Sequence, residues 1–87
     1  MFGEFIKERR LNLGLTLRGF CREIGFDASN WSKTERGLLP PPRDEETLTK
    51  IAQVLGIKIG SPTWVELKDL AFVDAGRIPK DLLSDAK

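Results

Sequence analysis

The sequence predicts an all-α domain built from five short helices. Apolar residues recur at positions i, i+3, i+4 and i+7 in several segments, which is the spacing of one helix face. Glycine, proline, or a serine or aspartate in capping position separates these segments. No stretch alternates polar and apolar residues as a half-buried strand would. With 87 residues, 40% of them apolar, the chain has enough apolar side chains for one modest core.

The first predicted helix runs from Phe2 to Leu13 and is closed by Gly14. Its inward face carries Phe2, either Phe5 or Ile6, Arg10 and Leu13. Arg10 has two interpretations: an exposed cation whose stem lies over the core, or a partly buried charge that needs a carboxylate partner. We favour the second, with Glu35 as the partner.

Two short helices follow within residues 16–37 and meet at a tight corner. The first carries the apolar stripe Leu17, Phe20, Cys21 and Ile24 and ends at Gly25, and Asp27 caps a second helix that begins at Ala28. The plausible inward residues of the second helix are Ala28, Trp31 and Thr34, and its outward residues are Ser29, Asn30, Ser32, Lys33 and Arg36. Such mixed donors, acceptors and cations suit the base edges of a DNA major groove. We interpret this segment as a recognition helix, with Trp31 in the core and Cys21 as inert packing.

The second half of the chain predicts two more helices. Residues 38–43 hold three consecutive prolines, which favour an extended, stiff connection. Asp44 caps a helix whose apolar stripe is Leu48, Ile51, Ala52 and Leu55 and which stops at Gly56. Ser61 and Pro62 then begin a fifth helix that extends to about Gly76.

The fifth helix has more apolar residues than one face can hold. Trp64, Leu67, Leu70 and Ala71 can point inward, which leaves Val65, Phe72 and Val73 on another side. The tail, residues 77–87, adds Ile78, Leu82 and Leu83 in otherwise polar sequence. The surplus is covered by the tail or forms a subunit interface, and the two are compatible. We therefore expect a domain at residues 1–76 followed by a docking or partner-binding segment at residues 77–87.

Composition narrows the function classes. The net charge is only +1, but residues 1–43 hold eight Lys/Arg against five Asp/Glu and residues 44–87 six against eight, so the predicted corner lies in the basic half. There is no histidine and only one cysteine, which argues against an enzyme, a metal site or a cofactor. No apolar run approaches the ~20 residues of a membrane span. No signal-peptide pattern opens the chain, so we expect a cytoplasmic protein.

The sequence resembles the phage-repressor and Cro-type helix-turn-helix family, the Xre-like regulators, over roughly residues 5–64. The resemblance rests on the order and spacing of short motifs: Arg10, Leu13-Gly14-Leu15-Thr16, Cys21, Ile24-Gly25, Glu35-Arg36-Gly37, Leu48, Ile51-Ala52 and Leu55-Gly56. It implies a compact five-helix repressor-like domain whose second and third helices form the helix-turn-helix.

The resemblance also implies which residues contact DNA. Base contacts are expected from Ala28, Ser29, Ser32 and Lys33, and phosphate contacts from Thr16, Leu17, Arg18, Asn30, Arg36 and Arg43. The predicted Arg10–Glu35 pair also fits the family, where the equivalent pair ties the first helix to the third.

The leading functional hypothesis is a sequence-specific transcriptional regulator, most simply a repressor, that binds double-stranded DNA as a homodimer. A second hypothesis is an antitoxin-type or partner-binding regulator whose C-terminal apolar segment binds another protein, such as a toxin or a regulatory protease. A third is an interaction module that has lost DNA binding.

Overall fold

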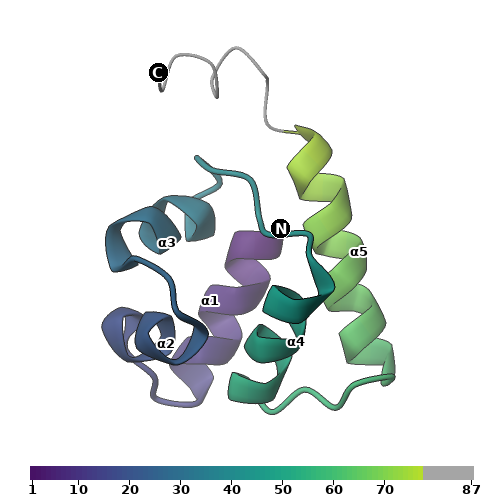
Figure 1. The fold of residues 1–87 in the computed structure, drawn as a ribbon, viewed down its shortest axis with the longest axis horizontal. Coiled ribbons are helices and arrows are strands. Elements are labelled where there is room, and N and C mark those ends of the chain that lie inside the picture. The colour runs from purple at the N-terminus through teal and green to yellow at the C-terminus, as the bar shows by residue number, and fades with distance from the viewer. Residues whose placement is uncertain (78–87) are drawn as a thin grey trace.

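The computed structural model describes residues 1–77 of the chain, as five helices with no strand among them (Figure 1). The helices are α1 (Phe2–Asn12), α2 (Leu17–Ile24), α3 (Ala28–Glu35), α4 (Glu45–Val54) and α5 (Pro62–Arg77). The prediction of an all-α fold with five helices is confirmed.

The helix starts are set by side chains adjacent in sequence. Thr16, Asp27, Asp44 and Ser61 each accept a hydrogen bond from the backbone N–H three residues further on, at 2.9 to 3.2 Å. Each bond satisfies one of the N–H groups that a helix start leaves without an intrahelical partner. Gly25 ends α2 in the left-handed conformation, with φ of 77°, where a Cβ would be strained. Local chemistry alone therefore accounts for these boundaries.

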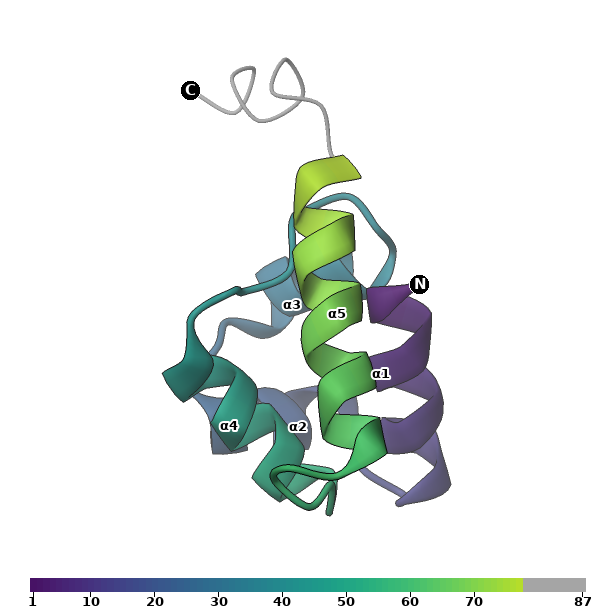
Figure 2. The same cartoon turned by 90° about the vertical axis from the view of Figure 1, so that its right-hand side faces the viewer.

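α1 lies between α3 and α5 in the helix bundle. It packs against α3 on one side and α5 on the other, while α2 contacts both α3 and α4, and α4 contacts α5 (Figure 1). Figure 2, turned by 90°, shows α5 running beside α1 with α4 on its other flank. The largest fully buried side chains come from all five helices: Trp31, Phe2, Phe20, Ile6, Ile51, Leu67 and Cys21.

Two details of α1 differ from the sequence analysis or resolve it. Ile6 is fully buried and Phe5 only half-buried, so Ile6 is the core residue of that pair. The prediction that Leu13 faces the core is wrong, because its side chain is 53% exposed. α1 ends at Asn12, so Leu13 follows the last regular turn and leaves the inward face.

The proline-rich connection between α3 and α4 forms no helix, as predicted. Pro41 at its centre is buried, so the connection docks onto the domain as well as spanning it. The three prolines predict a stiff connection, but their local sequence does not predict that Pro41 packs against the domain.

Within residues 1–77, no helix combines the length and apolar character that crossing a membrane requires.

Candidate nucleic-acid interface

The corner between α2 and α3 has the geometry of a helix-turn-helix. Only residues 25–27 separate the two eight-residue helices. The Phe26 N–H donates to the Cys21 carbonyl at 2.9 Å, which closes the turn directly after α2. The Phe26 ring then meets the Trp31 ring edge-on, with centroids 5.2 Å apart, so the turn is packed against α3. The corner is thus held by its own backbone and by one aromatic contact.

The start of α2 presents unused backbone donors. The Thr16 hydroxyl accepts from the Gly19 N–H at 3.0 Å, and the Thr16 carbonyl accepts from Phe20. Within residues 1–77, the N–H groups of Leu17 and Arg18 have no hydrogen-bond partner. The Leu17 side chain packs against the core, so this residue offers its backbone alone. Free N–H groups at the positive end of a helix dipole make a ready anion site.

The outward face of α3 is polar. Ser29, Asn30 and Lys33 are exposed, and Ser32 is half-buried. Ala28 is also half-buried and packs against the core, so its methyl group is only partly available to another molecule. The predicted base contacts therefore share one helix, with Ser29 and Lys33 the most accessible of them.

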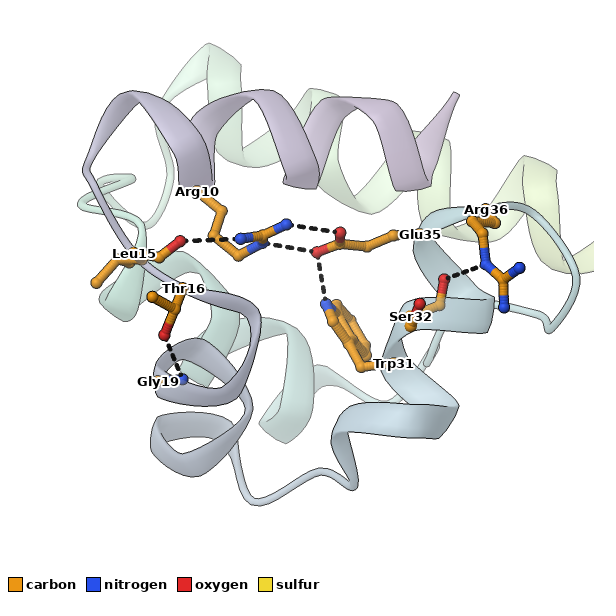
Figure 3. Close-up of polar contacts among 8 residues, drawn as sticks. All are labelled: Arg10, Leu15, Thr16, Gly19, Trp31, Ser32, Glu35 and Arg36. Carbon is orange, nitrogen blue, oxygen red and sulfur yellow. Dashed lines mark hydrogen bonds and ion pairs between the residues drawn. The ribbon is translucent and has the colours of Figure 1, made fainter.

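Arg36 caps the C-terminal end of α3. Its Nε donates to the Ser32 carbonyl at 3.4 Å, and the side chain is exposed. Figure 3 shows Arg36 lying apart from the buried polar side chains, at the end of the helix. Because a guanidinium has five N–H donors, most of them stay open for an anion.

Arg43 lies in a different place from the other predicted phosphate contacts. Its guanidinium carbon is 5.7 Å from the centre of the Phe72 ring on α5. This contact joins the α3–α4 connection to the surface that the sequence analysis assigned to a subunit or partner contact. Arg43 is therefore associated with α5 as well as with the loop that follows α3.

A buried polar network joins α1 to the inner side of α3 (Figure 3). Arg10 Nε and one terminal nitrogen donate to the two carboxylate oxygens of Glu35, at 3.0 and 3.1 Å. The other terminal nitrogen donates to the Leu15 carbonyl at 2.9 Å, and the Trp31 indole N–H donates to Glu35 Oε2 at 3.0 Å. The Arg10 and Glu35 side chains are only 7% and 5% exposed.

The predicted partners Arg10 and Glu35 lie together in the structure. Their further partners, Trp31 and the Leu15 carbonyl, were not predicted. Trp31 and Glu35 stand four residues apart on one helix, and that spacing was a visible signal for a contact. Nothing local predicted the Leu15 carbonyl as an acceptor, because its position depends on how the chain leaves α1.

The outer face of α5, meaning Val65, Phe72 and Val73, is 51%, 69% and 50% exposed. Trp64, Leu67 and Ala71 are buried on its inner side, as the sequence analysis expected. The other predicted contact residues, Ile78, Leu82 and Leu83, lie outside the described residues.

Among residues 1–77, no group of three or more His, Cys, Asp or Glu side chains could hold a metal ion. Cys21 is buried, and burial, followed by the charge of Glu35, raises the pKa of its thiol. A thiol in this state is a poor nucleophile.

Comparison with known proteins identifies the family. No curated protein and no solved structure matches the chain. The family model described as "Helix-turn-helix domain" matches residues 1–68, which include α1 to α4 and the start of α5. The match covers the corner, the polar helix and the buried network described above. The chain belongs to the helix-turn-helix domain family.

Proposed function

We propose that this protein is a sequence-specific DNA-binding transcriptional regulator of the phage-repressor type, with α3 as its recognition helix. One observation carries the proposal: α3 exposes a row of hydrogen-bonding and cationic side chains while its opposite side is held by a buried ion pair. Membership of a helix-turn-helix family, which is typically DNA-binding, supports it.

The proposed reading residues are Ser29, Ser32 and Lys33, with a methyl contact from Ala28. A lysine donates to a guanine edge, a serine reads either donor or acceptor, and an alanine touches the thymine methyl. Around them, phosphates are bound by the α2 N–H groups of Leu17 and Arg18, the Thr16 hydroxyl, and the side chains of Arg18, Asn30, Arg36 and Arg43. The open α2 start and the exposed Arg18 and Arg36 support this assignment.

We further propose a homodimer in which the outer face of α5 meets its copy. Exposed Val65, Phe72 and Val73 are the supporting observation, because apolar side chains gain free energy when a second copy covers them. A dimer of this kind reads two half-sites about one helical turn apart. Repression follows if the bound dimer excludes other proteins from the same stretch of DNA.

The same exposed face also favours a second candidate, a regulator whose α5 surface binds a different protein, such as a toxin. In that case α5 and the segment after it carry the function, and the DNA-facing side chains of α3 do not.

Selection from a random duplex-DNA pool, repeated at two salt concentrations, tests the proposal. We expect an enriched palindrome with half-sites about one turn apart. Binding that depends on salt but not on sequence, or no binding, would reject sequence-specific regulation and leave the partner-binding candidate.

Lys33→Ala tests the role of α3 directly. If Lys33 reads a base, specific affinity falls by ~1–3 kcal/mol and the preference at one base pair is relaxed. If it binds phosphate, all sequences weaken equally and the salt slope falls by ~1.

Lys68→Ala is the matched control, since it removes the same charge from α5, where Lys68 pairs with the exposed Glu45 at 3.1 Å. Affinity for the selected DNA should be retained in this variant. Equal losses in both lysine variants would contradict a special role for α3.

A further inference from the structure

Few buried side chains hold α3 against the rest of the domain, although the proposed function requires it to keep its outward side chains in register with DNA bases. Its buried residues are Trp31, Thr34 and Glu35, so a single large apolar side chain anchors it. The Thr34 hydroxyl donates to the Asn30 carbonyl on the same helix and ties α3 to nothing else. The rotation of α3 about its own axis therefore depends mainly on Trp31 and on the Glu35 carboxylate, with smaller contributions from Ala28, which packs against the core, and from the close approach of the Glu35 backbone to Gly3.

Trp31 is held on several sides. Its ring meets Phe2 of α1 edge-on with centroids 6.2 Å apart, Phe20 of α2 at 5.6 Å, and Phe26 of the turn at 5.2 Å. Three different segments thus fix one indole. Aromatic pairs at these distances prefer defined tilts, so they resist rotation of the central ring as well as its withdrawal.

The indole N–H adds a second constraint. It donates to Glu35 Oε2, the same oxygen that accepts from Arg10 Nε (Figure 3). Arg10 in turn holds the Leu15 carbonyl, directly before the Thr16 cap of α2. A continuous chain of hydrogen bonds therefore links the inner side of α3 to the start of α2.

We infer that Trp31 is the positioning residue that sets the rotation of the recognition helix relative to the phosphate-binding start of α2, and with it the base selectivity of the protein. The inference rests on the proposed function, because it concerns how the same DNA-facing surface is held.

A small rotation of α3 matters because its outward side chains lie far from the helix axis. Ser29 and Lys33 are two residues before and after Trp31, so they lie on the opposite side of the helix. With side chains about 5–6 Å from the helix axis, a rotation of 10–20° moves them by roughly 1–2 Å. A designed or evolved site has to be held within about 0.5 Å. A loosened Trp31 would therefore misplace base contacts without removing any of them.

Trp31→Phe removes the indole N–H and one ring while keeping an aromatic side chain in the core. The measurement is the ratio of affinity for the selected operator to affinity for random duplex DNA, at a temperature where the variant is folded. We expect this ratio to fall about ten-fold, the scale of one misplaced base contact, with affinity for random DNA nearly unchanged. Residual dipolar couplings of the amides should report a changed orientation of α3 relative to α2.

Phe26→Leu is a milder second variant, because Phe26 is 36% exposed and its loss removes one ring from around the indole without opening the core. We expect a loss of about three-fold in the same ratio, since part of the constraint remains. Ile51→Val is the stability control, because Ile51 is fully buried on α4, which packs against α2 and α5. This variant should lose stability and keep both the affinity ratio and the couplings.

Wild-type ratios and couplings in both Trp31→Phe and Phe26→Leu would overturn the inference. A fall in the ratio that Ile51→Val reproduces at equal stability would also overturn it, because a general loosening would then explain the effect. If the wild-type protein selects no operator, the proposed function fails, and the couplings alone decide whether Trp31 orients α3.

Discussion

α3 and α5 are held in the same domain by different means. α3 has eight residues and is anchored by one indole and one buried carboxylate. α5 has sixteen residues and buries Trp64, Leu67 and Ala71 while leaving Val65, Phe72 and Val73 exposed. α1 packs against both helices.

The difference shows how a short helix can keep a fully polar outer face. A helix of two turns is marginal alone and depends on its contacts with the rest of the domain. α2, also of eight residues, buries Phe20, Cys21 and Ile24, whereas α3 buries one large apolar side chain and the Glu35 carboxylate. A buried ion pair demands one geometry, because each charge loses much of its compensation when the pair is displaced. α5 is twice as long and buries more apolar side chains, and its Asp74 carboxylate also accepts a hydrogen bond from the Phe2 N–H of α1 at 2.6 Å.

Among the substitutions that test this difference between α3 and α5, Glu35→Ala should have the largest effect on stability. The substitution leaves Arg10 buried without its carboxylate and removes the acceptor of the Trp31 N–H. We expect the free energy of unfolding to fall by roughly 3 kcal/mol, measured by urea denaturation. Glu66→Ala, the control, removes an exposed carboxylate from α5 and should change the free energy of unfolding by less than ~0.5 kcal/mol.

The double variant Arg10→Met with Glu35→Leu sharpens this test. It removes both charges and should recover part of the stability that Glu35→Ala loses, because no unpaired charge remains buried. A denaturation midpoint of Glu35→Ala equal to that of the wild type would show that the Arg10–Glu35 pair does not stabilise the packing of α3 against the domain.

Gly3→Ala tests the side of α1 that faces α3. A Cβ at Gly3 would overlap the backbone oxygen of Glu35 and lie 2.7 Å from its Cα, so the two helices would have to separate. We expect a loss of about 1–3 kcal/mol. Gly76→Ala on α5 meets nothing within 4 Å and should be neutral or stabilise by up to ~1 kcal/mol.

A thermal melt of the two glycine variants decides the matter. A Gly3→Ala midpoint at or above that of Gly76→Ala would mean that α1 and α3 separate at no cost, which would contradict a closely fitted contact between them.

The smallest expected effect comes from the start of α4, where neither a buried ion pair nor a large apolar face is involved. Hydrogen bonds from the Thr47 hydroxyl and then from its N–H hold the pKa of Asp44 below its ordinary value. A lowered folded-state pKa stabilises the protein above the unfolded pKa of about 3.9, and this contribution is lost as pH falls through the folded value.

Asp44→Asn keeps an acceptor at the helix start and cannot titrate. Melting points measured from pH 6 to pH 2 should therefore fall slightly less steeply in this variant than in the wild type. Parallel curves would contradict a contribution from Asp44 to acid unfolding.

The sequence by itself determined what depends on neighbours within one helical turn. The predicted caps Asp27, Asp44 and Ser61, the stop at Gly25 and the polar face of α3 all depend on residues a few positions apart. The Thr16 cap, which was not predicted, rests on an equally local contact. The Arg10–Glu35 pairing was also within reach, because a charge on an apolar face needs a carboxylate that comes to the same place.

Only the tertiary structure decided how the helices fit together. The exposure of Leu13, the burial of Pro41, the Leu15 carbonyl as an Arg10 partner and the close approach of Gly3 to Glu35 all depend on the path of distant segments. Helical spacing specifies which face is apolar, but it does not specify which helix covers that face or how closely. The place of Trp31 among three phenyl rings is the clearest case, because each ring comes from a different segment of the chain.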